Sequence, residues 1–202
     1  MAKIVIIGAG SGFGGRLSID ILARGSLKKS TIALCDISKT RLGQVQDYVQ
    51  RAIDGHNLPG KVIASTNRED LLSGADCVVT AVSIGGAAYW GEPYRSEVEI
   101  PLKYGVQQTV ADTIGVGGVF RFLRTADEHL RFAKDMERLC PDALMLNYTN
   151  PMCMLTWLHS VGSSIQNVGL CHSVQGTTKK LAEGVGVDAL AHEAEATRRP
   201  GR

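Results

Sequence analysis

Residues 3–15 read KIVIIGAGSGFGG, so an apolar run ends in a cluster of glycines near the start of the chain. Four apolar residues in succession are typical of a strand that is buried on both faces. In a dinucleotide-binding fold, the first glycine after such a strand allows a tight turn and the second lets the backbone approach a pyrophosphate. The N–H groups and the positive dipole end of the following helix then bind the phosphates. The segment therefore predicts a phosphate-binding turn.

Two registers of the glycine pattern fit this segment. One reads G-x-G-x-x-G from Gly10, but its turn would start two residues beyond the apolar run. The other starts at Gly8, directly after the run, and has Phe13 in the place of the third glycine. We prefer the second register because the strand must end where the turn begins. Gly8 and Gly10 are then the predicted phosphate glycines.

This register also assigns roles to the residues that open the following helix. Ser11 is the predicted helix cap and a further part of the cofactor site, since serine is a favoured N-cap residue. Gly12 and Gly14 would loosen the first turn of the helix, because glycine is a weak helix former.

An acidic residue ends the second apolar run of the chain. Asp36 comes 26 residues after Gly10, where an acid can bind a ribose 2′-hydroxyl and repel a 2′-phosphate. A helix N-cap is the other role that fits Asp36. Ser83 follows the fourth apolar run, on the edge of the sheet where the nicotinamide normally lies. Together these residues predict NAD, in preference to NADP, as the cofactor.

Short apolar runs alternate with helical patterns along the chain. The predicted strands are 3–7, 31–35, 61–65, 75–82, 143–147 and 167–170, and the predicted helices are 17–24, 40–53, 120–139 and 152–160. This alternation predicts an α/β fold, a Rossmann-type doubly wound parallel sheet of the lactate/malate-dehydrogenase kind. Residues 84–118, rich in glycine and aromatic residues, are predicted to form an excursion over a site rather than core.

Composition limits the classes of partner. The chain is 44% hydrophobic, and none of its apolar runs approaches the roughly 20 residues that span a membrane. A net charge of +2 with interspersed signs gives no argument for nucleic acid or a membrane surface as a partner. The five cysteines include no C-x-x-C pair, which suits reduced thiols. We therefore expect a cytoplasmic protein.

Two motifs in the second half carry polar groups just after predicted strands. Asn150 precedes Pro151, so it is either a helix cap or an amide that binds a ligand. Cys171 and His172 follow the last strand. A thiolate beside an imidazole can bind a divalent ion or form a nucleophile–base pair, and a purely structural role is the third alternative.

With these motifs the chain resembles the NAD- and metal-dependent glycosidases of glycoside hydrolase family 4. The resemblance runs from about residue 3 to residue 188. The blocks that carry it are GAGS at 8–11, IGG at 84–86, DTIGVGGVFRFLR at 112–124, LCPD at 139–142, NYTNPM at 147–152 and GLCHSVQG at 169–176. Cysteine followed by histidine at 171–172 resembles the branch that acts on unphosphorylated α-glycosides: α-galactosidases, α-glucosidases and α-galacturonidases.

The resemblance implies NAD and Mn²⁺, or another divalent metal, as cofactors. It also implies that Cys171 is a metal ligand, that His172 is a catalytic group beside it, and that Asn150, Asp112 and Arg121 bind the sugar. The family chemistry is transient oxidation at sugar C3 and elimination across C1–C2, followed by addition of water and return of the hydride. The implied substrate is an α-glycoside or oligosaccharide, and the implied full-length assembly is a homo-oligomer.

The chain departs from the family after residue 188. Family members are much longer, and a Gly-x-Asn-His segment that supplies a second metal ligand is replaced by a sequence in which His192 has different neighbours. We therefore expect an NAD-binding domain with the start of the metal and sugar site at 1–188, an irregular tail at 189–202, and a missing C-terminal substrate domain. Such a truncated chain is expected to bind NAD without turnover.

Two other functions remain open on the sequence alone. An NAD-dependent 2-hydroxy-acid dehydrogenase of the malate/lactate type shares the glycine turn and Asp36, although it gives Cys171 and Asn150 no role. A non-catalytic NAD-binding module is the third hypothesis. Galactose, glucose and galacturonate all remain candidates for the sugar.

Overall fold

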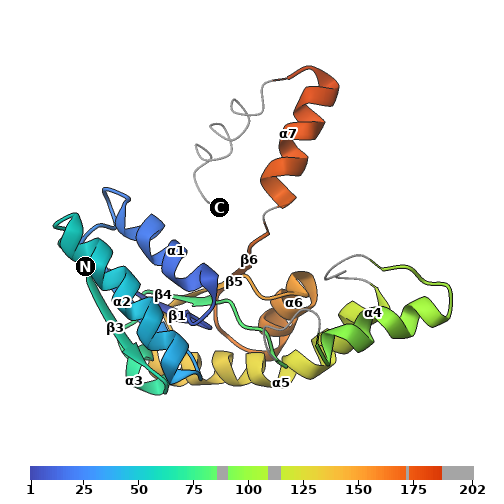
Figure 1. Cartoon of the computed structure of the whole chain (residues 1–202), viewed down its shortest axis with the longest axis horizontal. Coiled ribbons are helices and arrows are strands. Elements are labelled where there is room, and N and C mark those ends of the chain that lie inside the picture. Colours follow the sequence, from blue (N-terminus) through green and yellow to red (C-terminus); the bar gives the residue numbers. More distant parts are fainter. Residues whose placement is uncertain (86–90, 109–114, 172, 188–202) are drawn as a thin grey trace. The chain divides into compact units, whose positions relative to one another are not determined.

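A six-stranded parallel sheet forms the centre of the protein. The computed structural model describes residues 1–85, 91–108, 115–171 and 173–187. The chain divides into two compact units, Met1–Gly169 and Leu170–Arg202, and the sheet belongs to the first (Figure 1). Its strands are β1 (Lys3–Ile7), β2 (Thr31–Cys35), β3 (Lys61–Ser65), β4 (Cys77–Thr80), β5 (Leu144–Asn147) and β6 (Asn167–Gly169).

The strand order is β3-β2-β1-β4-β5-β6, with every neighbouring pair parallel. This is the order of a doubly wound dinucleotide-binding sheet, in which the chain reverses direction across the sheet between β1 and β4. The predicted fold class is therefore confirmed. All six predicted strands are observed. β4 is shorter at both ends than the prediction of 75–82, β5 begins one residue later than predicted, and β6 ends one residue earlier.

Helices connect the strands and cover the sheet. In the first unit they are α1 (Gly12–Leu22), α2 (Lys39–Gly55), α3 (Glu69–Leu72), α4 (Tyr94–Lys103), α5 (Val116–Leu139) and α6 (Met152–Gly162). The second unit contains α7 (Ser173–Val185). The sequence patterns did not predict α3, α4 or α7. Helix α4 lies within the stretch predicted as an excursion and contains Pro101, which is unfavourable inside a helix.

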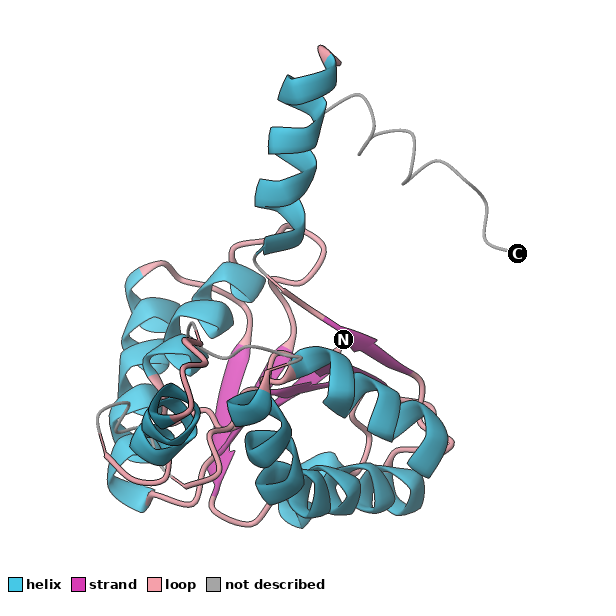
Figure 2. Cartoon of the chain, turned by 90° about the vertical axis from the view of Figure 1, so that its right-hand side faces the viewer, coloured by secondary structure: helices cyan, strands magenta, loops and turns pink. Residues whose placement is uncertain are grey.

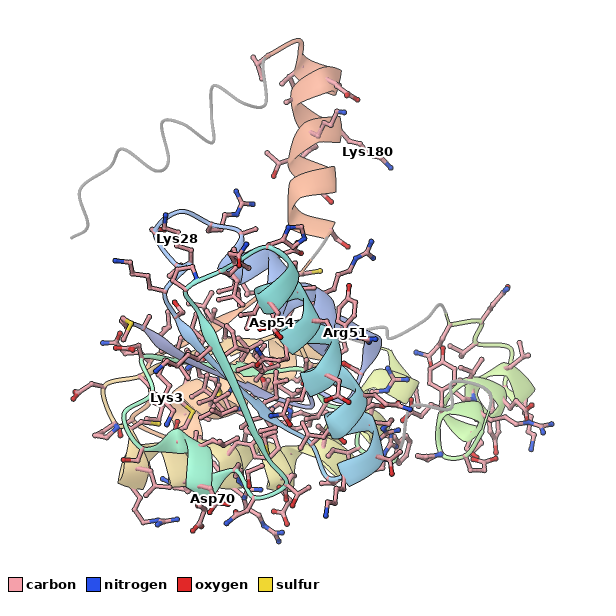
Figure 3. The ribbon with its side chains drawn as sticks, turned by 60° about the vertical axis from the view of Figure 1, so that its left-hand side comes forward. Lys3, Lys28, Arg51, Asp54, Asp70 and Lys180 are labelled. Atoms are coloured by element: carbon pink, nitrogen blue, oxygen red, sulfur yellow. The ribbon has the colours of Figure 1, made fainter. Side chains whose placement is uncertain are left out.

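Both faces of the sheet are apolar and covered by helices. On β1, Val5 and Ile7 pack with α3 and α5, whereas Ile4 and Ile6 pack with α1 and α2. Successive strand residues point to opposite faces, so a continuous apolar run serves two cores. Figure 2 shows the strands lying between helices on both sides. On α2, Arg51 and Asp54 are exposed on the outer surface of the helix (Figure 3).

The parallel arrangement places the carboxyl ends of all six strands at one edge of the sheet. The loops after β1, β2, β4 and β5 therefore meet there, and they contain most of the predicted site residues of the first unit. None of the helices in the described part of the chain is long and apolar enough to cross a membrane.

Candidate functional site

The turn after β1 begins at Gly8. This residue has a φ of +89°, in the left-handed region that favours glycine, and a Cβ there would lie 2.3 Å from the carbonyl oxygen of Ala81. The N–H groups of Gly8 and Ala9 both donate to the carbonyl oxygen of Cys35, at 2.9 Å. The structure thus adopts the register that starts directly after the strand.

Asp36 holds the second glycine of the turn. Its Oδ2 accepts a hydrogen bond from the N–H of Gly10 at 2.9 Å, and its Oδ1 accepts from the N–H of Ser38 at 2.8 Å. A Cβ on Gly10 would lie 2.6 Å from the Asp36 carboxyl carbon. Asp36 is buried, with Arg41 Nη2 3.6 Å from Oδ1. A carboxylate has about four acceptor positions, and these two hydrogen bonds use two of them.

Helix capping does not explain Asp36. Ser38 is the N-cap of α2, and its hydroxyl accepts from the N–H of Arg41 at 3.4 Å. Asp36 instead joins the β1 turn to the end of β2 through the Gly10 bond. The ribose-binding role of Asp36 stays a prediction.

Ser11 occupies the predicted N-cap position of α1 but makes no capping bond through its side chain. Its backbone there has φ −82° and ψ 162°. Its Oγ is buried and has no hydrogen-bond partner within the described residues. The predicted position of the cap is therefore confirmed, whereas the hydroxyl forms no capping bond, and a buried hydroxyl without a partner costs free energy. The hydroxyl lies instead at the helix N-terminus, where an anion such as a phosphate is favoured.

Gly14 has a packing role that the sequence analysis missed. A Cβ on Gly14 would lie 2.2 Å from the carbonyl oxygen of Ala9, so its absence lets α1 approach the turn closely. A Cβ on Gly12 would meet nothing within 4 Å. The third glycine of the pattern is thus one residue later than the usual spacing. Phe13 instead packs against Tyr148 of the β5 loop, with ring centroids 4.9 Å apart.

A buried hydrogen-bond network connects the loops after β4 and β5. Asn147 is fully buried, and its Oδ1 accepts from Thr80 Oγ1 at 2.9 Å and from the N–H of Thr149 at 3.0 Å. Its Nδ2 donates to the carbonyl oxygen of Thr149 at 3.3 Å. Thr149 Oγ1 accepts from the N–H of Val82 at 3.1 Å. The network holds the backbone at Val82, which precedes Ser83, and at Thr149, which precedes Asn150.

Sequence reasoning singled out neither Asn147 nor Thr149. The available signal was the position of two polar residues at the end of an otherwise apolar strand, where a buried amide must find partners.

The predicted sugar-binding residues have different surroundings. Asn150 is exposed, and its Oδ1 accepts from the N–H of Met152 at 3.3 Å, at the start of α6. Arg121 Nε donates to Glu97 Oε2 at 2.8 Å, so its guanidinium is paired with a carboxylate of α4. Asp112 lies outside the described residues.

The predicted metal ligand lies in the second unit. Cys171 is exposed, and His172 lies outside the described residues. Within the described part of the chain, no group of three histidine, cysteine, aspartate or glutamate residues is placed to hold a metal ion. Burial raises the pKa of the thiols of Cys35 and Cys77 to about 11, so both are protonated near neutral pH and are poor metal ligands. Cys171 was the single metal ligand predicted from the sequence, and the structure describes it as an exposed thiol.

Comparison with known families gives a match over nearly the whole chain. The model of the family 4 glycosyl hydrolases matches residues 3–187. An alpha-galactosidase from Rhizobium meliloti (strain 1021) is 40% identical over 186 residues, which cover 91% of this chain and 37% of that protein. An alpha-galactosidase from Bacillus subtilis (strain 168) is 40% identical over 189 residues, covering 93% and 43%. The chain therefore spans about two fifths of the length of these relatives.

Solved structures share the fold. A 6-phospho-beta-glucosidase from Thermotoga maritima, solved with manganese, NAD⁺ and glucose-6-phosphate, is 24% identical with a TM-score of 0.77, over 94% of this chain and 44% of that one. A lactate dehydrogenase from Cryptosporidium parvum, solved with lactic acid and a nicotinamide cofactor, is 19% identical with a TM-score of 0.65, over 93% and 51%. These likenesses confirm the predicted lactate-dehydrogenase-like architecture.

Proposed function

The chain belongs to family 4 of the glycosyl hydrolases, and from this we propose that it forms the cofactor-binding part of an NAD- and metal-dependent enzyme that hydrolyses α-glycosides. The observation that carries the proposal is the family match over 3–187, on a turn whose backbone and acidic partner fit a dinucleotide. We place α-galactosides first, because two relatives at 40% identity are alpha-galactosidases. α-Glucosides and α-galacturonides are the other substrates that the family resemblance implies.

The proposed NAD site consists of Gly8, Gly10, Ser11, Asp36 and Ser83. The phosphates would lie against the turn and the start of α1. A Cβ at either glycine would collide with protein atoms there, and the buried Ser11 hydroxyl has no hydrogen-bond partner among the residues that the structure describes. The two remaining acceptor positions of Asp36 suit the ribose hydroxyls, and its charge disfavours a 2′-phosphate. Ser83, in the loop after β4, would lie on the nicotinamide side.

The proposed metal and sugar site uses Cys171, His172, Asn150, Asp112 and Arg121. The Cys171 thiolate would bind the divalent ion, proposed to be Mn²⁺, and His172 beside it would transfer a proton. The amide of Asn150 would orient sugar hydroxyls. The chemistry supplied by bound NAD⁺ and a divalent ion is transient oxidation at C3, which permits C1–C2 elimination.

The domain arrangement is part of the proposal. Residues 1–188 would form the cofactor domain, 189–202 an irregular tail, and the substrate domain of the longer relatives would complete the site. The partners would be an α-glycoside or oligosaccharide and, at full length, further copies of the same protein. The absence of turnover by the 202-residue chain alone stays a prediction.

Hydrolysis of p-nitrophenyl α-galactoside tests the function. We expect nitrophenol release by a protein that contains this chain together with a substrate domain, in the presence of NAD⁺, Mn²⁺ and a reductant. Chelation of the metal or omission of NAD⁺ should abolish the release. Cys171→Ser should abolish the activity. Cys153→Ser, at another exposed cysteine, is the matched control and should retain it.

Two outcomes would contradict the proposal. Accumulation of NADH with lactate or malate would support a 2-hydroxy-acid dehydrogenase instead. NAD binding by this longer protein without either reaction would support a non-catalytic module.

A further inference from the structure

A buried carboxylate joins α4 to α5. The Glu97 side chain is 4% exposed and lies between two arginines of α5. Arg121 donates to Oε2 through Nε, at 2.8 Å, and through Nη2. Arg124 donates to Oε1 through Nη2. Each carboxylate oxygen therefore has its own guanidinium partner, in an Arg–Glu–Arg cluster with a formal charge of +1.

Close backbone packing brings these side chains together. A Cβ on Gly117, in the first turn of α5, would lie 2.6 Å from the carbonyl oxygen of Glu97. The Arg121 guanidinium carbon also lies 5.0 Å from the centre of the Tyr94 ring. The cluster therefore lies between α4 and α5, where close packing of the two helices fixes the positions of its side chains.

Stability alone is a weak reason for such a cluster. Removing three charged groups from water has a large free-energy cost, which their mutual attraction offsets only when the geometry is good, and apolar replacements of buried ion clusters are often neutral or stabilising. Buried ionic groups do, however, fix the direction of the groups they hold. If the cluster serves to position another part of the protein, one of its side chains must bind a group outside the cluster.

Arg124 supplies that target. Its Nε donates to the carbonyl oxygen of Ile84 at 3.1 Å. Ile84 belongs to the loop after β4, residues 82–85, which we call the β4 loop. On the other side of Ser83, the N–H of Val82 donates to Thr149 Oγ1 at 3.1 Å. The Ala81–Val82 and Ile84–Gly85 peptide groups, which lie before and after the segment that contains Ser83, are thus held by side chains from different elements.

The end of the β4 loop is also held by packing. Gly85 has a φ of +101°, and a Cβ there would lie 2.7 Å from Cδ of Pro93, which directly precedes α4. The loop therefore lies against the same helix that carries Glu97.

We infer that Glu97 and Arg124 are positioning residues for the β4 loop. Glu97 holds the Arg124 guanidinium, Arg124 holds the Ile84 peptide, and the peptide fixes Ser83 at the nicotinamide side of the cofactor. The inference rests on the proposed function, because it takes the β4 loop to be part of the NAD site. Glu97 touches neither cofactor nor substrate in this account and acts through Arg124.

Amide hydrogen exchange and NAD affinity, measured on the 202-residue chain, test the inference together. In Glu97→Gln and in Arg124→Met we expect exchange at the β4 loop to be about tenfold faster and the Kd for NAD to be about tenfold higher, the effect of losing one charged hydrogen bond. Arg124→Lys should be intermediate, because an ammonium group cannot reproduce the two fixed directions of a guanidinium. The control is Arg95→Met, which breaks an exposed ion pair with Glu99 on the same helix and should change neither quantity.

The results distinguish a failure of the positioning role of Glu97 and Arg124 from a failure of the proposed NAD site. Unchanged exchange at the β4 loop in both variants would overturn the positioning role, and so would faster exchange with an unchanged Kd. Failure of the unsubstituted chain to bind NAD would instead remove the proposed cofactor site, whatever the exchange rates are. If Glu97→Gln does not fold, Arg124→Met and Arg124→Lys carry the test, because both leave the Glu97–Arg121 pair intact.

Discussion

Gly10 and Gly12 lie two residues apart and have opposite surroundings. A Cβ on Gly10 would lie 2.6 Å from the Asp36 carboxyl carbon, whereas a Cβ on Gly12 would meet nothing within 4 Å. We expect Gly10→Ala to weaken NAD binding more than tenfold, because the turn and Asp36 must move apart. Gly12→Ala should weaken binding much less, although Gly12 opens α1 beside the proposed phosphate site, and should raise the free energy of unfolding by up to about 1 kcal/mol. Calorimetric titration and thermal unfolding measure both effects, and equal NAD affinity in the two variants would contradict the prediction.

Asp36 and Arg41 together predict a change in cofactor preference. Asp36→Asn removes the charge that disfavours a 2′-phosphate, while Arg41, 3.6 Å away and half exposed, can then pair with that phosphate. We expect NAD affinity to fall about tenfold and NADP affinity to rise. Adding Arg41→Met should remove the gain for NADP. An unchanged preference for NAD in Asp36→Asn would show that this carboxylate does not read the ribose.

At this scale the sequence predicted the positions of the glycine turn and of Asp36 because both follow directly from strand ends. It did not predict the unpartnered Ser11 hydroxyl or the packing role of Gly14. Both depend on how closely α1 approaches Ala9, a distance between segments that spacing in the sequence does not encode.

The connection between the β4 and β5 loops predicts the effect of losing one hydroxyl. Thr149→Val keeps the shape of a buried side chain but removes the acceptor for the Val82 N–H. We expect the free energy of unfolding to fall by about 1–3 kcal/mol and the Val82 amide to exchange faster. Thr149→Ser keeps the hydroxyl and is the matched control. Denaturant titration with amide-resolved exchange measures both, and similar behaviour of the two variants would count against the network.

Elements with a regular apolar pattern could be predicted and the others could not. The four inner strands, β2, β1, β4 and β5, are largely buried on both faces, so each reads as a short apolar run, whereas the edge strands β3 and β6 are more exposed. Helix α4 contains Pro101 and buries Glu97, whose partners Arg121 and Arg124 lie on a different helix. A buried acid is satisfied only in three dimensions, so the sequence showed no sign of this burial, and the glycines and aromatic residues of the segment indicated an excursion over a site rather than core.

For the whole molecule, two buried histidines predict a loss of stability in acid. His129 of α5 and His159 of α6 are fully buried, with Nδ1 of the first 3.2 Å from Nε2 of the second. Burial lowers the pKa of His129 from 6.5 to about 3, with a further contribution from His159, and burial lowers the pKa of His159 to about 4. Both imidazoles therefore stay neutral in the folded chain under conditions that protonate them in the unfolded chain.

The sign of the effect follows from proton binding. Below pH 6.5 the unfolded state binds more protons, so the free energy of unfolding falls as the pH decreases towards the folded-state pKa values. At pH 5 we expect a loss of about 2 kcal/mol for each histidine. Urea titrations from pH 7 to pH 5 measure it. The double variant His129→Gln/His159→Gln should show a much flatter dependence, and an equally steep one would mean that other groups cause the loss.

The central claim is that the turn at Gly8–Gly10, held by Asp36, binds NAD in this family 4 glycosyl hydrolase chain. Calorimetric titration of the 202-residue chain with NAD⁺ and with NADP⁺ tests it most directly. We expect one molecule of NAD⁺ to bind per chain, more tightly than NADP⁺, and this binding to be lost in Gly10→Ala. No binding of NAD⁺, or binding that Gly10→Ala leaves intact, would contradict it.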